Sequence, residues 1–280
     1  MGKWEQIKTM EPSIQSQLIQ FSNKHLPGYL AWCLDYPLVL KIIGKLLCVE
    51  EVLKLKDKYK DISNFDLVNT IIDYVGLTGI YENIKKIPPY GRLLVVANHP
   101  LGGADWLLLL QCLKTVREDI KVVINKDVHT LIINMRDLFI PVDSYATFNE
   151  LARKQIGESL EKEEAVIIFP SGGISIMTIK GVRDRKWKCG VAFFSREHHS
   201  DILPVFIGGR FNLSFYFYPM RLRRFLLLRN LLYPPVQKVK LVIGDVISHE
   251  ELLKENDLWK ISSQLKIAVY KLGAQAKHSK

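Results

Sequence analysis

Short apolar runs alternate with longer mixed segments along the chain from residue 88 onward. The runs are rich in Val, Ile, Leu and Phe and are bounded by Gly, Pro, Asn or Asp, which is typical of short strands buried on both faces. The predicted strands cover residues 92–97, 121–125, 138–142, 165–169, 202–206 and 239–243. Predicted helices cover residues 104–115, 147–162 and 249–276. The pattern predicts an α/β fold with a mixed, mostly parallel central sheet covered by helices.

The preceding part of the chain has a different pattern. Residues 11–87 carry apolar positions mostly at helical spacing, which predicts an N-terminal helical extension. A cluster of helix breakers, Pro88-Pro89-Tyr90-Gly91, follows it. We therefore expect a helical N-terminal region over residues 1–87 and an α/β domain over residues 88–280.

Two leucine-rich segments that also carry basic residues are candidates for contact with a lipid surface. Residues 37–47 place two lysines four positions apart, and residues 221–233 interleave four arginines with leucines. Both patterns suit a helix lying in the plane of an anionic membrane, and both also suit a core-facing helix whose basic side chains reach solvent. No apolar segment reaches the ~18 residues needed to span a bilayer, so the sequence predicts a peripheral protein without a transmembrane helix.

The composition narrows the choice of partner. The chain has 280 residues, 48% of them hydrophobic and 24% charged, as in ordinary globular proteins. Its formal net charge of +10 favours a polyanionic partner, either nucleic acid or anionic lipid. The sequence has no recognisable helix-turn-helix, RNA-recognition or zinc-finger pattern, and its arginines alternate with long aliphatic residues. We therefore expect an anionic membrane surface as partner and no nucleic acid.

The spacing of the cysteines and histidines indicates in which compartment the protein resides and whether it holds a metal ion. The four cysteines form no Cys-x-x-Cys pair, and the N-terminus lacks the apolar stretch of a signal peptide. These features predict a reducing compartment, hence a cytoplasmic protein peripheral on the cytoplasmic face of the membrane. His198-His199 with Asp201 lies in a polar segment where adjacent histidines are more often exposed, so no metal site is expected.

The loop after the first predicted strand carries the strongest candidate for chemistry. His99 follows the strand directly after Asn98, and Asp105 comes six positions after His99, where a leucine-rich helix begins. A neutral imidazole can accept a proton near neutral pH, and a nearby carboxylate can orient it and stabilise its charged form. With no nucleophilic Ser or Cys beside it, the pair suits direct deprotonation of a hydroxyl group. The same residues also fit a plain strand-to-helix turn, in which Asp105 favours a helix N-terminus and His99 packs locally.

A second glycine-rich loop follows the strand at 165–169. It reads Phe169-Pro170-Ser171-Gly172-Gly173-Ile174-Ser175. Ligands of α/β sheets bind at the carboxyl ends of strands, and amides freed by Gly172 and Gly173 could bind an anionic group there. A Gly-Gly pair after a strand is also an ordinary tight turn. Ser171 is not in a Gly-x-Ser-x-Gly elbow, so we do not expect it to be a nucleophile.

Together the two loops resemble the motifs of the glycerolipid acyltransferases related to bacterial lysophosphatidate acyltransferase. Those motifs are His-x4-Asp and Phe-Pro-Glu-Gly-Thr-Arg-Ser. Here His99 and Asp105 match with one extra residue between them, as in the hemolysin-like branch that includes lyso-ornithine and glycine lipid acyltransferases. The residues that match the second motif are Phe169, Pro170, Gly172 and Ser175. The resemblance covers roughly residues 85–250.

The resemblance implies an O-acyltransferase of membrane lipid synthesis. It would move a fatty acyl group from acyl-ACP or acyl-CoA to the hydroxyl of a lysolipid, either a lysophospholipid or a lyso-amino-acid lipid. His99 would be the general base and Asp105 its orienting carboxylate, with amides of Gly102, Gly103 or the second loop as oxyanion donors. The resemblance implies no tightly bound cofactor. The implied partners are the lysolipid acceptor, the anionic membrane surface and, as a candidate, acyl carrier protein.

The second motif departs from the family pattern at two positions. Ser171 replaces the motif's Glu, and Ile174 replaces the Arg that usually helps to hold the acceptor phosphate. If the acceptor carries a phosphate, a cation other than the motif's Arg must bind it. Alternatively, the acceptor has a different head group. The candidate cations are Arg136, Arg183, Arg185 and Arg210. The alternative hypothesis is a nonenzymatic membrane- or lipid-binding relative whose second motif has degraded.

Overall fold

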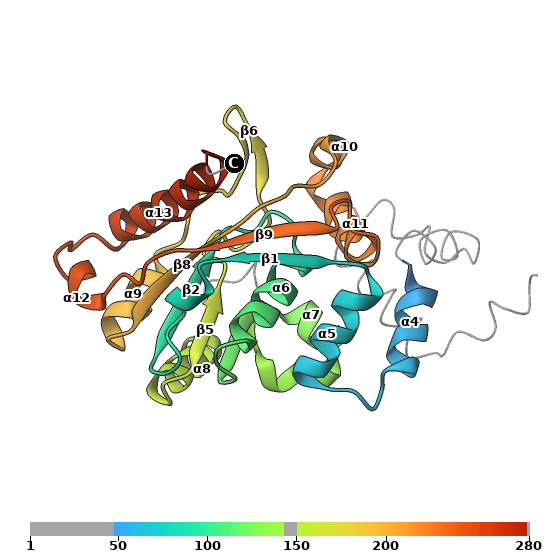
Figure 1. Ribbon diagram of the computed structural model, residues 1–280, viewed down its shortest axis with the longest axis horizontal. Coiled ribbons are helices and arrows are strands. Elements are labelled where there is room, and N and C mark those ends of the chain that lie inside the picture. Colours follow the sequence, from blue (N-terminus) through green and yellow to red (C-terminus); the bar gives the residue numbers. More distant parts are fainter. Residues whose placement is uncertain (1–47, 143–149, 279–280) are drawn as a thin grey trace, which may run out of the picture. The chain divides into compact units, whose positions relative to one another are not determined.

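The structure is a computed structural model that describes residues 48–142 and 150–278 (Figure 1). The chain divides into two compact units. Among the described residues, one comprises 48–60 with 213–233, and the other comprises 61–142, 150–212 and 234–278. The domain boundary expected at residue 88 stays a prediction, because spatial grouping does not establish which part of the chain folds independently.

A seven-stranded sheet forms the centre of the second unit, and it confirms the predicted α/β class. Its spatial order is β1-β9-β8-β2-β5-β3-β4, and every neighbouring pair is parallel except β8 and β9. The strands are β1 (Thr78–Glu82), β2 (Leu93–Ala97), β3 (Ile120–Asn125), β4 (Phe139–Val142), β5 (Ala165–Ile168), β8 (Asp201–Ile207) and β9 (Lys238–Ile243). Six of them lie within one residue of the predicted bounds at each end.

The β2 strand lies inside the sheet, between β5 and β8, and all five of its residues are buried. Since these three strands are parallel, their carboxyl ends lie at one edge of the sheet. This arrangement places the loops that follow β2, β5 and β8 next to one another.

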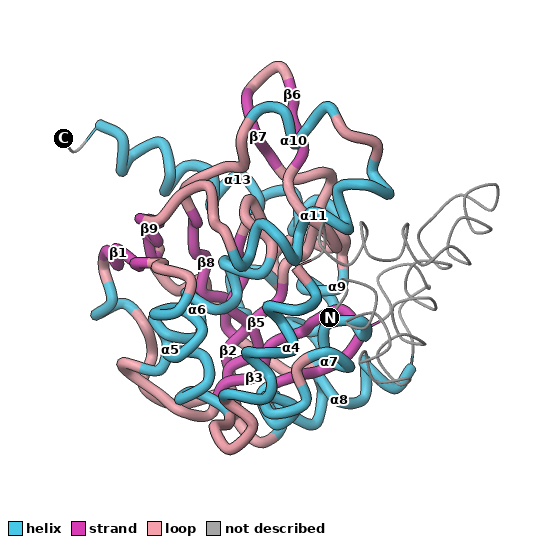
Figure 2. The backbone as a smooth tube through the Cα atoms, turned by 90° about the vertical axis from the view of Figure 1, so that its right-hand side faces the viewer, coloured by secondary structure: helices cyan, strands magenta, loops and turns pink. Residues whose placement is uncertain are grey.

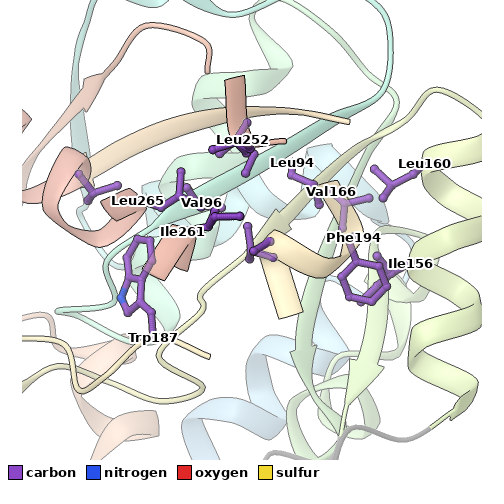
Figure 3. Close-up of a cluster of buried hydrophobic side chains, with 14 of the residues drawn as sticks. Leu94, Val96, Ile156, Leu160, Val166, Trp187, Phe194, Leu252, Ile261 and Leu265 are labelled. Atoms are coloured by element: carbon purple, nitrogen blue, oxygen red, sulfur yellow. The ribbon is translucent and has the colours of Figure 1, made fainter. Parts of the chain in front are cut away.

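Helices cover both faces of the sheet (Figures 1 and 2). They are α5 (Asn64–Tyr74), α6 (Gly103–Lys114), α7 (Lys126–Leu131), α8 (Glu150–Glu161), α9 (Gly190–Glu197), α12 (His249–Leu252) and α13 (Leu258–His278), with 3-10 turns η3 (Ile84–Lys86) and η4 (Ile133–Leu138). Side chains alternate between the faces of a strand. On one face, Leu94 and Val96 of β2 join a buried cluster with α8, α9, α12 and α13 (Figure 3). The α6 helix, with its run of buried leucines, contacts β1 and β3.

The other unit contributes α4 (Val49–Lys58), α10 (Leu213–Phe217) and α11 (Met220–Leu232). The arginine- and leucine-rich segment 221–233 is thus helical, and its placement in a membrane plane stays a prediction. The segment 37–47 lies outside the described residues. None of the helices in the described part of the chain has the length and apolar character needed to cross a bilayer.

Three elements differ from the sequence predictions. Residues 78–82 lie in the stretch predicted as helical but form β1, which pairs with β9 about 160 residues later; a local pattern does not report such a distant partner. The predicted helix at 249–276 is interrupted between α12 and α13. A two-stranded hairpin, β6 (Ile176–Thr178) and β7 (Gly181–Arg183), was not predicted, since strands of three residues are too short for a periodic signal.

Candidate active site

The loop from β2 to α6 is fixed at its start by a side chain. Asn98 Nδ2 donates to the carbonyl of Ile207 at 2.8 Å, and the Ile207 N–H donates back to Asn98 Oδ1 at 2.7 Å. This pair of hydrogen bonds ties the end of β2 to the end of β8. Gly102, with φ of 63° and ψ of −117°, turns the chain into α6 in a conformation that favours glycine. The backbone around His99 is thereby held from both sides.

His99 and Asp105 face one another within this loop. His99 Nδ1 lies 2.9 Å from Asp105 Oδ2, with the His99 side chain 17% exposed and the Asp105 side chain completely buried. The same Asp105 oxygen accepts a hydrogen bond from the Leu101 N–H at 2.8 Å. The distance is that of a hydrogen bond, but the contact does not meet the angular criteria for one. Poorly aligned hydrogen bonds are common between catalytic groups before substrate binds. The pairing leaves Nε2 as the ring nitrogen that can take a proton.

Burial has the largest effect on the electrostatics of Asp105. Burial raises the pKa of Asp105, the nearby charge of Asp184 raises it further, and the interaction with His99 lowers it. Asp105 Oδ1 is buried and makes no hydrogen bond with the described residues. A buried carboxylate is stabilised most by a neighbouring positive charge, so a proton arriving on His99 relieves the cost of burying Asp105.

The second loop lies against the first, as expected for neighbouring parallel strands. Ser175 N–H donates to the His99 carbonyl at 2.8 Å, and the Phe169 ring stacks on the His99 imidazole with centroids 4.2 Å apart. Ser171 Oγ is hydrogen-bonded to the Gly173 carbonyl at 2.6 Å, within its own turn. The loops of both motifs therefore meet at His99.

The rest of the second loop is a tight turn. Gly172 has a φ of 64°, in the left-handed region that favours glycine, and its N–H donates to the Phe169 carbonyl at 3.0 Å. The Pro170 carbonyl accepts a hydrogen bond from the Lys188 N–H at 2.9 Å. Gly173 is exposed, and a Cβ atom built there would meet nothing within 4 Å. This leaves the backbone beside Gly173 open to a ligand.

Asp184 joins the two loops, and the motifs gave no indication of it. Its Oδ1 accepts hydrogen bonds from the His99 N–H at 3.2 Å and from Ser175 Oγ at 2.5 Å. Its Oδ2 accepts one from Trp187 Nε1 at 2.8 Å. The one signal in the sequence is that Asp184 is the sole acidic residue between residues 165 and 196.

The α13 helix supports Asp184 from behind. Lys266 Nζ donates to the Asp184 carbonyl at 2.7 Å and to the Arg185 carbonyl at 2.8 Å. The Asp184 N–H donates to Tyr270 Oη at 2.7 Å. Burial lowers the pKa of Lys266 and raises the pKa of Tyr270. The long helix α13 thus holds Asp184, and Asp184 in turn holds the loop that carries His99.

Replacing Asp184 by Asn is expected to disturb the position of His99. The Asn side chain has one acceptor oxygen and one NH₂ donor, whereas Asp184 has two acceptor oxygens. The donor group must therefore face either Trp187 Nε1 or the His99 N–H and Ser175 Oγ, and the donors on that side lose their acceptor. We expect a loss of about 1–3 kcal/mol in the free energy of unfolding. A small misplacement of a catalytic group is costly, so we expect kcat to fall about tenfold.

Urea unfolding and steady-state acyl-transfer kinetics check this. The matched control is Asp201→Asn, which changes a carboxylate at the opposite edge of the sheet, where Asp201 pairs with His249 at 3.0 Å. It should leave kcat unchanged. An Asp184→Asn variant with normal kcat would show that Asp184 does not position His99.

The comparison with known proteins identifies the family of the chain. A family model described as acyltransferase matches residues 22–233. The chain belongs to this acyltransferase family. The motif-based resemblance stated above is thereby confirmed.

Two relatives of this chain are lyso-glycine lipid O-acyltransferases. The Bacteroides thetaiotaomicron protein is 25% identical over 182 residues, which are 64% of this chain and 65% of that protein. The Phocaeicola vulgatus protein is 25% identical over 163 residues, or 58% of each chain. The matches thus span less than two thirds of the length of these relatives. Both relatives belong to the glycine lipid branch that the motifs indicated.

A solved structure is also similar to this chain. It is the 1-acyl-sn-glycerophosphate acyltransferase of Thermotoga maritima, with a TM-score of 0.47 and 16% sequence identity. The match covers 96% of this chain and 98% of that one.

The four candidate cations named from the sequence lie in different places. Arg136 lies in η4 before β4, at the edge of the sheet opposite the two loops. Arg183 lies over the Tyr270 ring, with its Cζ 4.8 Å from the centroid, and Arg185 is exposed. Exposed Arg210 follows Gly209, where an added Cβ would lie 3.0 Å from Leu101 Cδ1, so this loop packs against the first motif. Topology therefore separates Arg136 from the site.

Lys188 is a cation at the site that the sequence did not single out. A Cβ atom added at Gly172 would lie 3.1 Å from Lys188 Nζ, so the ammonium group lies against the glycine turn of the second motif. The Lys188 side chain is exposed, and its backbone carbonyl accepts a hydrogen bond from Ser262 Oγ of α13 at 2.7 Å. The glycine turn of the second motif, which lacks the family's Arg, therefore has a basic group beside Gly172.

The histidines 198 and 199 have separate neighbours. His198 Nδ1 lies 3.8 Å from Glu161 Oε1, while the His199 ring lies against the His249 ring, with centroids 5.4 Å apart. Within residues 48–142 and 150–278, no group of three or more His, Cys, Asp or Glu side chains is placed to hold a metal ion.

Proposed function

We propose that this protein is an O-acyltransferase that transfers a fatty acyl group from acyl-ACP or acyl-CoA to the hydroxyl of a lyso-amino-acid lipid. The observation that carries the proposal is the pair of His99 and buried Asp105, held between two motif loops at the carboxyl ends of parallel strands. Membership of the acyltransferase family and the names of the two relatives support the reaction class.

His99 acts as general base in this mechanism. Its Nε2 takes the proton of the acceptor hydroxyl while the hydroxyl oxygen attacks the thioester carbonyl carbon. A carbon–oxygen bond forms, and the carbonyl oxygen carries the negative charge of the tetrahedral intermediate. The carbon–sulfur bond then breaks, and the leaving thiolate receives the proton from His99. Asp105 stabilises the imidazolium between the two proton transfers, as an orienting carboxylate does in hydrolytic triads.

The substrate-binding surface consists of the two loops. Gly102 and Gly103 lie at the N-terminus of α6, where backbone amides can face a developing oxyanion. In the second loop, Phe169 stacks on His99, Pro170 and Ser175 join the loop to its neighbours, and Ser171 bridges the turn. Gly172 and Gly173 leave that turn accessible. The reaction uses no tightly bound cofactor.

Lys188 is the cation that we assign to the acceptor head group. A glycine lipid carries one carboxylate, and a single lysine ammonium is a compact point charge that suits it. The bidentate arginine that suits a phosphate is replaced by Ile174. These two features favour an amino-acid lipid over a lysophosphatidate as acceptor.

Lys188→Gln should raise the KM for the acceptor about threefold to tenfold, because one solvent-accessible charge pair is lost. The kcat should stay within twofold of wild type, about the precision of such assays. Steady-state kinetics with dispersed lyso-glycine lipid measure both. The control is Lys162→Gln, the same change at the amino end of β5, at the opposite edge. An unchanged KM for the Lys188 variant would show that Lys188 does not bind the acceptor.

Product analysis tests the proposed reaction. The purified chain is incubated with acyl-ACP or acyl-CoA and with lyso-glycine lipid or lysophosphatidate, and diacylated lipid is measured by mass spectrometry. We expect ester formation that is faster with lyso-glycine lipid. A protein that binds lysolipid but forms no product with either donor would be the nonenzymatic relative instead.

A further inference from the structure

The β6–β7 hairpin projects from the second unit (Figures 1 and 2) and begins directly after the second loop. Its first residue, Ile176, follows Ser175, whose N–H donates to the carbonyl of His99. The two strands pair only with each other and not with the seven-stranded sheet. Whatever the tip of the hairpin contacts is therefore held close to the site.

The tip presents apolar side chains to solvent in an ordered turn. Ile179 is 103% exposed and Met177 is 36% exposed. Thr178 Oγ1 donates to the Gly181 carbonyl at 2.7 Å and accepts a hydrogen bond from the Lys180 N–H at 3.2 Å. These bonds fix the turn with Ile179 outermost. Single exposed apolar residues are common, but an ordered tip made of them beside a lipid-processing site suggests a binding role.

The hairpin and the segment that follows it are basic. Residues 176–186 carry four cations and one acidic residue. The cations are Lys180, Arg183, Arg185 and Lys186. The acidic residue, Asp184, is buried and hydrogen-bonded as described above. The accessible charge around the apolar tip is therefore positive, which is complementary to anionic lipid head groups.

We infer that the β6–β7 hairpin docks the protein on an anionic bilayer. Ile179 and Met177 enter the boundary between head groups and acyl chains, and Lys180 meets the lipid phosphates. This inference rests on the proposed function in that the acceptor is a membrane lipid. A strand of three residues spans on the order of 10 Å, so docking brings the second loop to the membrane surface. The acceptor hydroxyl can then reach His99 without its acyl chain leaving the bilayer completely.

A bilayer fits this surface better than a protein partner does. A stable protein interface buries roughly 800 Å² on each side, whereas a narrow two-stranded tip offers one large side chain at its end. Insertion of a few apolar side chains beside cations is sufficient for reversible attachment to an interface. An acidic carrier protein docking on the hairpin is the competing outcome, and the experiment below separates the two.

Vesicle binding by the full chain tests the inference. Cosedimentation is measured with vesicles of equimolar phosphatidylcholine and phosphatidylglycerol, and with vesicles of phosphatidylcholine alone. We expect Ile179→Ser to weaken binding to the anionic vesicles about tenfold or more, because a large apolar side chain no longer enters the lipid. Ile179→Trp should bind at least as tightly as wild type, since Trp favours membrane interfaces. Lys180→Glu should weaken binding about fivefold or more, with little effect on phosphatidylcholine alone.

Matched controls lie at the opposite edge of the sheet. Tyr90, 82% exposed in the loop before β2, is changed to Ser, and Lys162, after α8, is changed to Glu. Both should bind vesicles as wild type does. Ile179→Ser that binds as tightly as Tyr90→Ser would overturn the inference.

Activity on a dispersed short-chain acceptor separates this inference from the proposed function. Ile179→Ser should retain wild-type turnover there, with either acyl-ACP or acyl-CoA as donor. A loss confined to acyl-ACP, with vesicle binding intact, would instead assign the hairpin to the carrier protein and overturn membrane docking. A third outcome is that the wild type forms no product but binds vesicles, and that Ile179→Ser binds them more weakly. The proposed reaction would then be wrong, while the docking surface would be supported.

Discussion

His99→Ala is expected to lower kcat for acyl transfer by at least about 1000-fold, which lies within the range that a positioned general base contributes. The remaining donors and binding contacts do not replace a base at Nε2. Steady-state assays with lyso-glycine lipid and either thioester donor measure the loss, and circular dichroism checks that the variant is folded.

The chain offers a closely matched control for this variant. His249 Nδ1 lies 3.0 Å from Asp201 Oδ1, so it forms a second His–Asp pair, but this pair lies at the amino end of β8, at the opposite edge from His99. His249→Ala should leave acyl transfer within about twofold of wild type. Equal losses in the two variants would indicate a general effect on folding and would contradict the role of His99.

Asp105→Asn is expected to lower the acyl-transfer activity without lowering the stability of the fold. The Leu101 N–H requires an acceptor at the Oδ2 position, so the Asn oxygen should take that place and still face His99 Nδ1. The ring orientation is then retained while the negative charge is lost. Since the imidazolium is no longer stabilised, we expect kcat to fall at least about 100-fold.

The same substitution should not destabilise the fold at neutral pH. Burial raises the pKa of Asp105 in the folded chain above its unfolded value of about 3.9. Between those two pKa values the folded state holds more protons than the unfolded state, so the contribution of Asp105 to the free energy of unfolding falls as pH rises through that range. Asn does not titrate, so the stability of the variant relative to wild type should increase with pH from about 4 upward.

Urea unfolding of both proteins across this pH range measures the difference. A variant that becomes relatively less stable as pH rises would mean that the folded pKa of Asp105 is lowered. The buried Asp105 carboxylate would then stabilise the folded state. The argument that Asp105 costs stability and is present for catalysis would be contradicted.

The sequence was sufficient for six of the seven strands of the sheet, but not for β1, and for the loop that brings His99 and Asp105 together. The buried strands are short apolar runs between breakers, and the loops after β2 and β5 carry motifs whose proximity follows from parallel pairing. The chemical types of His99 and Asp105, with Gly102 between them, indicated the first motif. Local pattern and short motifs carried this information directly.

The supporting residues could not be predicted because their partners are distant in the sequence. Asp184 contacts a loop 85 residues earlier, and its own support from Tyr270 lies 86 residues later. Lys188 reaches Gly172 only because the hairpin turns the chain back past the second loop. Such contacts depend on tertiary packing, and a single acidic residue in a basic segment was the sole trace of them.

The most direct test of the account is a rapid-quench experiment followed by intact-protein mass spectrometry. Wild-type protein is mixed with acyl donor alone, and then with donor and lyso-glycine lipid. We predict that the protein mass stays unchanged in both and that the acyl group appears only on the acceptor hydroxyl, in a reaction that His99→Ala does not carry out. An acyl-enzyme formed from the donor alone, or full product formation by His99→Ala, would contradict direct transfer with His99 as the base.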